Sequence, residues 1–221
     1  MKLGKRLSML DKAIKKRYSI IWDCCCDHGF LGMALLKRRA AKGVYFVDVL
    51  KQPMQQLSLI LQQRFSQAES RWKVFCRDLK LIEVPDKEQQ LFIIAGVGGD
   101  KTRGFIQSIH EKSKHLKIDF LICSVHGNYL VRELLIDLGF KLLDEVIIKE
   151  NKRFYELIYV SFSGEREISK TGELMWDLED AEHLEYLNKT INHFEKKAKV
   201  SPECYQGILD DYKKLGGSKF S

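Results

Sequence analysis

The sequence predicts an α/β protein: a doubly wound, mainly parallel sheet of seven strands, followed by a C-terminal α-helical hairpin. Three patterns predict it. Short apolar runs typical of buried strands alternate with amphipathic helical segments over residues 18–138. Two longer strand-like runs follow, joined by the tight connection Glu150-Asn151-Lys152-Arg153. Beyond residue 172, apolar residues recur every three or four positions, as on the buried face of long helices.

The first half of the chain begins with a basic helix and continues with alternating strands and helices. Leu3, Leu7, Leu10 and Ile14 share one face of an amphipathic helix within residues 1–17. Apolar strand-like runs lie at residues 18–26, 43–48, 72–76 and 91–95. Helical spacing marks residues 30–39 and 53–65, and Pro53 suits the first turn of the second of these helices.

The second half completes the sheet and adds the hairpin. Strands are predicted at residues 120–123, 141–149 and 154–162, and helices at 105–109 and at 130–138, the latter capped by Gly139. A heptad-like seam from Leu174 to Ala198 predicts one long helix, and Ser201-Pro202 begins another. Seven strands in this arrangement fit a class I methyltransferase-like Rossmann domain better than a six-stranded dinucleotide-binding domain.

Composition fixes the general class of the protein. The 221 residues are 45% hydrophobic and 30% charged, enough for a sizeable core. We expect one domain at residues 1–164 and a helical appendage at 165–221, with the boundary near Ser163-Gly164 and Lys170-Thr171-Gly172. The sequence shows neither a long apolar run nor a secretory signal, so we expect a cytoplasmic protein without membrane contact. Its six cysteines are then expected to be thiols.

The net charge of +7 is unevenly distributed along the chain. Residues 1–17 carry +6, residues 18–164 carry +4, and residues 165–221 carry −3. This asymmetry favours a polyanionic partner that meets the N-terminal half. A solvated amphipathic helix without a partner explains the same charge equally well.

Acidic residues follow three successive predicted strands. Asp23 and Asp27 lie at the end of the first, Asp48 ends the second and Asp78 follows the third. In an open parallel sheet, ligands bind at the carboxyl ends of the strands. An acid after the second strand suits ribose hydroxyls, and one after the third suits an adenine amine. Each Asp alone is better explained by helix capping or by solvation, but their joint placement indicates a ligand site.

The loops exclude the common nucleotide cofactors. The first loop has Cys25, Asp27 and Gly29 where a dinucleotide-binding domain needs G-x-G-x-x-G, and no G-x-x-x-x-G-K-[ST] motif is present. Negative charge around the first turn suits a sulfonium and an ammonium group rather than phosphates. S-adenosylmethionine is therefore the expected cofactor.

These motifs carry a family resemblance over residues 3–160. Five features resemble the bacterial tRNA (adenine-22-N1)-methyltransferase family, TrmK: Lys5-Arg6-Leu7, the spacing of Asp23 with Asp27-His28, the run Ile94-Ala95-Gly96-Val97-Gly98-Gly99, Arg132-Glu133, and Asp144-Glu145-Val146-Ile147. The helical tail is similar to the coiled-coil C-terminal domain of this family. The resemblance implies S-adenosylmethionine as cofactor, tRNA as partner, and methylation of adenine N1 at position 22.

The resemblance also assigns roles to individual residues. It implies that Asp27 and His28 shape the methionine side of the cofactor site, Asp48 the ribose side and Asp78 the adenine side. The expected cofactor contacts are Asp23, Cys25, Asp27, His28, Asp48, Val49, Asp78, Leu79, Ala95 and Gly96. The expected catalytic residues, beside the methyl group and the entering base, are Asp27, His28, Phe30, Gly96, Val97 and Gly98. The expected RNA contacts are Lys5, Arg6, Lys12, Lys16, Arg38 and Arg132.

Two stretches depart from the family pattern. Cys25-Cys26 replaces a Gly-Ser pair and Phe30 replaces Tyr, which narrows the space near the cofactor carboxylate. Cys123-Ser124-Val125 stands where the family has Gln-Pro-Asn, so amides expected beside the target base are missing.

Cys24-Cys25-Cys26 also raises the question of a metal site. Neighbouring residues of a strand point to opposite faces, and the chain has no C-x-x-C pair, so we expect buried thiols and no metal.

Methyl transfer to adenine N1 needs alignment rather than a strong base, because neutral adenine already offers a lone pair there. Phe30 is interpreted either as a stacking wall for the base or as a core aromatic, and His28 either as a ligand contact or as a helix cap. Two other functions compete: a methyltransferase acting on a small molecule or protein, and an RNA-binding paralogue with a degenerate cofactor site. The C-terminal helices are expected to clamp tRNA or to form a weak dimer of an otherwise monomeric protein.

Overall fold

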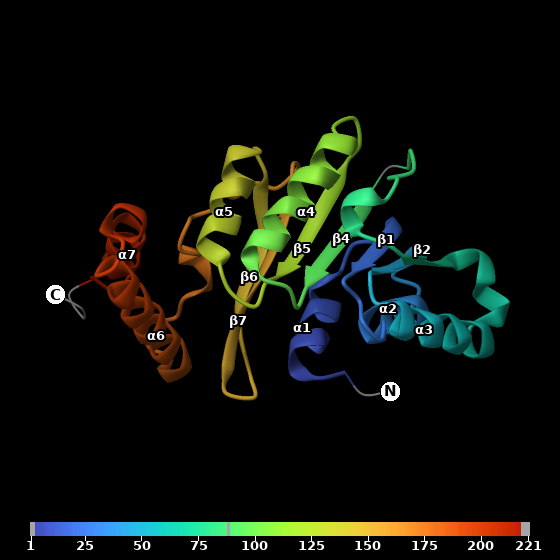
Figure 1. The fold of residues 1–221 in the computed structure, drawn as a ribbon, viewed down its shortest axis with the longest axis horizontal. Helices are drawn as coiled ribbons and strands as arrows, with labels where there is room; N and C mark the ends of the chain where they lie inside the picture. The colour runs from blue at the N-terminus through green and yellow to red at the C-terminus, as the bar shows by residue number, and fades with distance from the viewer. Residues whose placement is uncertain (1–2, 88, 218–221) are drawn as a thin grey trace.

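The computed structural model describes residues 3–87 and 89–217. Its centre is a seven-stranded sheet in the order β3-β2-β1-β4-β5-β7-β6 (Figure 1). The strands are β1 (Tyr18–Cys24), β2 (Ala41–Asp48), β3 (Trp72–Cys76), β4 (Gln90–Ala95), β5 (Ile118–Cys123), β6 (Lys141–Glu150) and β7 (Arg153–Ser161). The first five are parallel, whereas β7 runs antiparallel to both β5 and β6. The predicted seven strands and the terminal antiparallel pair are confirmed.

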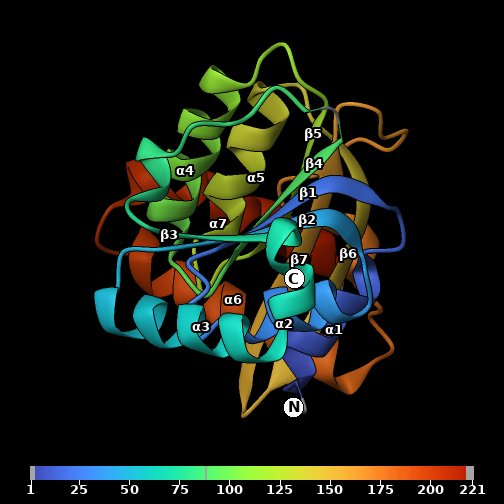
Figure 2. The ribbon, with the colours of Figure 1, turned by 90° about the vertical axis from the view of Figure 1, so that its right-hand side faces the viewer.

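Helices cover both faces of the sheet (Figure 2). On one face lie α1 (Lys5–Ala13), α2 (Phe30–Lys37) and α3 (Lys51–Arg64), which share a buried cluster with the strands. On the other face lie α4 (Gly99–Lys112) and α5 (Asn128–Asp137). The strand residues divide between the two clusters by alternation, so Ile93 packs on the first face and Phe92 on the second. Burial on both faces explains the near-continuous apolar runs of the sequence.

The C-terminal hairpin consists of α6 (Ala181–Ala198) and α7 (Pro202–Gly216). Its apolar seam packs onto Tyr129 of α5, so the hairpin is attached to the body through a third buried cluster. The predicted helix start at Leu174 is wrong: Leu174 is exposed within a short 3-10 helix, η3 (Glu173–Met175), and α6 begins after Asp180. The Asp180 carboxylate accepts from the N–H groups of Glu182 and His183, which fixes the start of α6. The predicted first-turn proline of α7 is confirmed at Pro202.

Arg132 binds the hairpin region to the sheet and does not contact solvent. Its side chain is fully buried and forms ion pairs with Glu145 of β6 (2.6 Å) and Glu156 of β7 (2.9 Å). Glu145 also accepts from the N–H of Leu174, and Glu156 from the hydroxyl of Tyr186 in α6. The expectation that Arg132 contacts RNA is therefore wrong, because both of its charge partners are internal and no part of its side chain reaches the surface.

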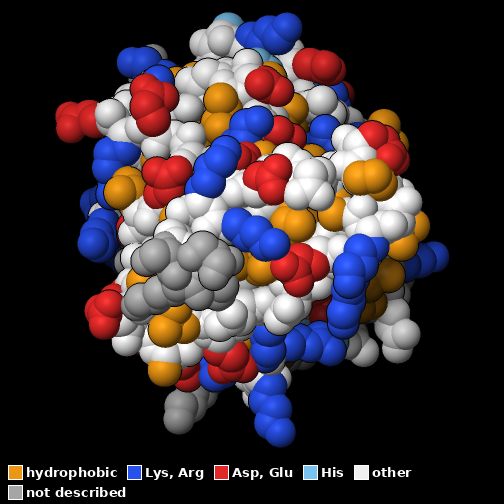
Figure 3. Space-filling model, turned by 90° about the vertical axis from the view of Figure 1, so that its left-hand side faces the viewer, with side chains coloured by type: hydrophobic (Ala, Val, Ile, Leu, Met, Phe, Trp, Pro, Cys, Tyr) orange, Lys and Arg blue, Asp and Glu red, His pale blue; other side chains and the backbone are white. Residues whose placement is uncertain are grey.

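The end of the molecule formed by α6 and α7 carries intermixed charges. Figure 3 shows Lys and Arg side chains interspersed with Asp and Glu over this face, with no large area of one sign. Within the described residues, no helix is both long enough and apolar enough to span a bilayer.

Candidate functional site

The candidate site lies at the carboxyl edge of the parallel strands. Cys24, the last residue of β1, pairs with Val47 of β2 and Ile94 of β4, and Asp48 pairs with Cys76 of β3. The four strand ends are therefore level, and the loops that follow them emerge at one edge of the sheet. Asp23, Asp48 and Asp78 belong to three adjacent strand ends, and the glycine-rich loop follows the fourth.

The turn after β1 has an unusual backbone. Cys25 (φ 55°), Asp27 (φ 48°) and Gly29 (φ 65°) all have left-handed backbone conformations, which residues other than glycine rarely adopt. Asp48 holds this turn in place: its Oδ2 accepts from the N–H of Asp27 at 2.9 Å, and its Oδ1 from the N–H of Leu50 at 3.0 Å. Each carboxylate oxygen keeps a lone pair for a further donor. Strained residues concentrate at ligand sites, where the surrounding structure enforces them.

Asp23 lies beneath the turn rather than beside it. Its side chain is buried, and Oδ2 accepts from the N–H of Gly32 in the first turn of α2 at 2.7 Å. Burial raises the pKa of Asp23 to about 7; the Gly32 hydrogen bond opposes this shift and the charge of Asp48 adds to it. Direct contact of Asp23 with a ligand is therefore disfavoured, and its role is to anchor α2 below the site.

The three consecutive thiols are protonated, weakly reactive groups. Burial raises the pKa of Cys25 to about 12, with further upward contributions from Asp48 and Asp23 and a downward one from Lys101. Burial also raises the pKa values of Cys24 and Cys26. No group of three or more His, Cys, Asp or Glu side chains among the described residues is arranged to hold a metal ion. Cys25 thus lies amid the strand-end carboxylates as a neutral group.

Several predicted site residues are exposed around this turn. Phe30 is 43% exposed, so it is not a core aromatic, and its ring stacks on His28 at 5.5 Å. His28 Nε2 lies 3.6 Å from Asp27 Oδ2. Asp78 is exposed and accepts from the N–H of Lys80 through Oδ1 only.

Val49 and Leu79, predicted to contact the cofactor, differ sharply in exposure. Val49 is 61% exposed, whereas Leu79 is buried, so only Val49 presents its side chain to a ligand.

The loop after β4 packs closely against the loop after β5. The N–H of Gly96 donates to Cys123 O, that of Val125 to Val97 O, and that of Gly99 to His126 O. A Cβ at Gly99 would lie 2.8 Å from Gly127 O, and one at Gly98 would lie 2.6 Å from the His126 ring. Gly96, at φ 82°, is exposed and has open space around its Cα apart from the Arg6 guanidinium. Its backbone is therefore accessible to a ligand.

Arg6 is the predicted RNA contact that the structure brings to this loop. A Cβ at Gly96 would lie 3.8 Å from one of its terminal nitrogens, and its guanidinium lies 4.9 Å from the Tyr155 ring. The Glu150 side chain accepts from the Arg6 N–H at 3.0 Å. Among the described residues, the buried Nε of Arg6 has no hydrogen-bond partner. A half-buried cation thus lies at the edge of the glycine-rich loop.

The other predicted RNA contacts separate into two kinds. Lys5 and Lys12 are exposed on α1. Lys16 pairs with Asp119 at 2.7 Å, and Arg38 pairs with Asp11 at 2.7 Å while donating to the carbonyls of Asp11 and Ile14. Arg38 therefore caps the end of α1, and each of these two predicted RNA contacts already has an ion-pair partner within the protein.

Sequence reasoning missed three residues that shape the site. Gly32 would place a Cβ 2.3 Å from the Phe46 ring and 2.8 Å from Asp23 Oδ2, and a glycine inside an apolar helix was a visible signal of such close packing. His126 against Gly98, and Lys101 near Cys25, result from the approach of loops that are distant in sequence. No local sequence pattern predicts these two contacts.

An aromatic cavity of about 530 Å³ adjoins the loop after β5. It lies between this loop, α5 and the α6–α7 hairpin, and its walls include Phe154, Tyr186, Phe194 and Tyr205 together with Lys189 and Lys197. Aromatic faces beside cations are the surface on which single-stranded bases stack.

Solved structures share this fold along almost the whole chain. The Streptococcus pneumoniae protein Sp1610 has a TM-score of 0.77 at 19% identity, covering 97% of each chain. The B. subtilis M1A22 tRNA methyltransferase TrmK has a TM-score of 0.74 at 19% identity, covering 96% of this chain and 94% of its own. M. capricolum TrmK, solved with S-adenosyl-homocysteine, has a TM-score of 0.76 at 16% identity, covering 97% and 96%.

Among curated proteins, none matched the sequence. A family model described as a methyltransferase domain matches residues 3–158, which include α1, every strand up to most of β7, and the whole candidate site. The chain therefore belongs to the methyltransferase-domain family.

Proposed function

We propose that this protein is an S-adenosylmethionine-dependent methyltransferase that modifies N1 of adenosine 22 in tRNA. The observation that carries the proposal is the carboxyl edge itself: carboxylates at three adjacent strand ends surround a left-handed turn opposite the open Gly96 loop. The likeness to TrmK structures, including one solved with S-adenosyl-homocysteine, supports it.

The residues at this edge fit the cofactor by their chemistry. Asp48 retains acceptor capacity for ribose hydroxyls, and Asp78 Oδ2, which accepts no hydrogen bond from a described residue, suits an adenine amine. Asp27 and His28 are exposed on the turn, where the carboxylates favour a cationic sulfonium and ammonium. The remaining contacts in this proposal are Cys25, Val49, the backbone of Leu79, Ala95 and Gly96. When bound, S-adenosylmethionine supplies an electrophilic methyl group on a positively charged sulfur.

The adenine acceptor needs positioning rather than activation. An adenine held with its N1 lone pair aimed at this methyl group would accept it, and the positive charge would then lie on the base. The exposed carboxylate of Asp27 lies nearby. Its negative charge favours positive charge on the sulfur before transfer and on the base after it. The Gly96, Val97 and Gly98 backbone lets the base approach closely, and exposed Phe30, stacked on His28, offers a face for it. The predicted pair of loops after β4 and β5 thereby forms the acceptor side.

Lys5, Arg6 and Lys12 on α1 are proposed to bind phosphates of the tRNA. Arg6 lies nearest the acceptor loop, and its terminal guanidinium nitrogens are the atoms that face Gly96 there. The aromatic cavity beside α6 and α7 supports a role of residues 165–221 in holding the RNA rather than in forming a dimer. A tRNA substrate is also consistent with residence in the cytoplasm.

Methyl transfer to matched tRNA transcripts tests the proposal. The protein is incubated with methyl-labelled S-adenosylmethionine and two transcripts that differ only at position 22, adenosine in one and guanosine in the other. Label is expected in the first alone. Equal labelling of both contradicts the position, and labelling of neither, with the cofactor bound, contradicts the activity and favours the RNA-binding paralogue.

A further inference from the structure

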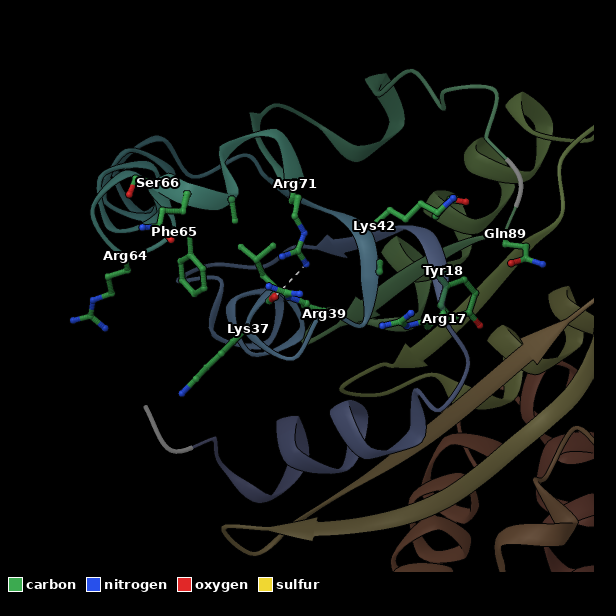
Figure 4. A pocket seen from close by; sticks show the side chains of 15 residues that line it. Arg17, Tyr18, Lys37, Arg39, Lys42, Arg64, Phe65, Ser66, Arg71 and Gln89 are labelled. Carbon is green, nitrogen blue, oxygen red and sulfur yellow. Dashed lines mark hydrogen bonds between the residues drawn. The ribbon is translucent and has the colours of Figure 1, made fainter.

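A polar hollow lies at the edge of the sheet opposite the candidate cofactor site. Its volume is about 870 Å³. The residues around it come from the start of β1 (Tyr18), the start of β2 (Ala41), the residue before β4 (Gln89), and the ends of α2 and α3 (Figure 4). Because β1, β2 and β4 are parallel, their first residues mark the amino edge of the sheet.

The charged side chains that line the hollow are all cationic among the described residues. Six basic side chains line it: Arg17, Lys37, Arg39, Lys42, Arg64 and Arg71. Among the described residues, no carboxylate lines it and none of these six side chains has an ion-pair partner. The one interaction drawn in Figure 4 is a long contact from Arg71 to the carbonyl of Leu36 at 3.5 Å. All but Arg71 are exposed, so their charges face solvent.

Helix ends account for only part of this cluster. Lys37 and Arg64 are the last residues of α2 and α3, where a cation interacts favourably with the helix dipole. Arg71 contacts the Leu36 carbonyl in the last turn of α2, whereas Arg17, Arg39 and Lys42 are outside the helices. Like charges gathered around one hollow repel each other, and a bound anion relieves that repulsion.

The size and the composition of the hollow fit a nucleic acid backbone. A volume of about 870 Å³ exceeds what one phosphate fills and suits a segment of several groups. Four of the six cations are arginines, whose planar guanidinium binds phosphate oxygens in pairs. On the C-terminal face drawn in Figure 3, the cations of the described residues are interspersed with carboxylates instead of standing alone.

Helix α1 connects this hollow with the cofactor edge. Arg6 at its start lies beside Gly96, and Arg17, four residues after its last residue, lines the hollow. Nine helical residues rise by about 14 Å, a distance that a folded RNA easily spans. Exposed Lys12 lies between the two ends. One RNA that follows α1 can therefore contact both edges.

We propose that the amino-edge hollow is a second phosphate-binding site for the RNA substrate. It binds the phosphate backbone of the RNA far from the methylated base and so orients the RNA on the enzyme. That this RNA is the methyl acceptor rests on the proposed function. The existence of the phosphate-binding site is independent of that function.

The test uses the full chain and a matched control. In the test variant Lys37→Gln, Lys42→Gln and Arg64→Gln are combined, since these exposed residues come from α2, β2 and α3. The control combines Lys87→Gln, Lys114→Gln and Lys117→Gln, which removes the same charge from exposed positions outside the hollow. A second variant, Arg17→Gln with Lys42→Gln, repeats the test without changing a helix end.

Full-length tRNA binding is measured by fluorescence anisotropy over a range of salt concentrations. We expect both test variants to bind about 10- to 100-fold more weakly. The slope of log K against log salt should become shallower, by up to about 0.9 for each phosphate that the variant no longer neutralises. The control and the affinity for S-adenosyl-homocysteine should stay at wild-type values. A short hairpin that cannot reach both edges should bind wild type and variants alike.

Three results overturn the proposal. The first is test variants that bind full-length tRNA as the control does. The second is an equal loss of affinity for the short hairpin. The third, from a parallel binding assay with vesicles of anionic lipid, is a loss of affinity for the vesicles alone. If wild type transfers no methyl group while the variants still lose tRNA affinity, the proposed activity fails and the phosphate site stands.

Discussion

At the residue scale, Asp48 and Asp78 are the side chains on which cofactor binding should depend most. Replacing a carboxylate that accepts from a ligand hydroxyl or amine loses about 1.5–3 kcal/mol, or roughly 10- to 100-fold in affinity. We expect this loss for Asp48→Asn and Asp78→Ala. Calorimetric titration with S-adenosyl-homocysteine measures it, with Asp86→Ala, an exposed acid outside the site, as control. Unchanged affinity in both variants would remove these residues from the site.

Asp23 should give the protein a pH-dependent stability. Its pKa is about 7 in the folded protein, raised chiefly by burial, against the ordinary value of 3.8. The folded state therefore holds a proton that the unfolded state has released between these values, and the free energy of unfolding falls as the pH rises through this window. Asp23→Asn keeps an acceptor for Gly32 and removes the effect. Between pH 5 and pH 8, Tm should fall less in the variant than in wild type.

The matched control for Asp23 is Asp86→Asn, which is exposed and should retain the wild-type profile. Parallel curves of Tm against pH for wild type and Asp23→Asn would show that Asp23 titrates in its ordinary range.

At the element scale, Gly32 sets how closely α2 packs on β2. A Cβ there would lie 2.3 Å from the Phe46 ring, so Gly32→Ala forces the helix outward at a cost of about 1–3 kcal/mol or more. Gly207, inside α7, has nothing within 4 Å of an added Cβ, and Gly207→Ala should stabilise by about 0.5–1 kcal/mol. Urea unfolding of the two variants checks this opposition. Similar effects of the same sign would refute the packing argument.

The Arg132 ion pairs join α5, the β6–β7 pair and the hairpin region. Arg132→Met leaves two buried carboxylates, Glu145 and Glu156, without their cation, which should cost about 3–5 kcal/mol. Lys141→Gln, which breaks the exposed pair with Glu167, should change stability by less than about 1 kcal/mol. Thermal unfolding distinguishes the two. A small effect of Arg132→Met would mean that these carboxylates gain solvent or take up protons.

Helices and strands that have a local sequence signal could be predicted. Contacts between residues distant in the sequence have no such signal and could not. The strand ends at Asp48 and Ala95 and the cap at Gly139 follow from apolar runs that stop at acids and glycines. The start of α6 was wrong because Leu174 fits the heptad spacing, whereas the Asp180 cap decides where the helix begins. Arg132 was misread for a related reason: a sequence shows a charge, but burial depends on carboxylates brought from two other strands.

At the scale of the whole molecule, the position of α1 determines where the positive charge of the sequence lies in space. The net charge of +7 is concentrated near a helix whose first turn lies beside the Gly96 loop and whose end leads to the amino-edge hollow. The acidic tail forms the opposite end of the molecule, which carries both signs of charge (Figure 3). RNA is therefore expected along α1, with the α6–α7 hairpin contacting it through the aromatic cavity.

The chemical identity of the methylated nucleoside tests this account most directly. The protein is incubated with S-adenosylmethionine and a tRNA transcript that has adenosine at position 22, and the digested product is analysed by mass spectrometry. The expected product is 1-methyladenosine, at most one per tRNA, and Asp48→Asn should form much less of it. A methyl group on another atom or another nucleotide, or an unmodified tRNA with a protein that binds the cofactor, would contradict it.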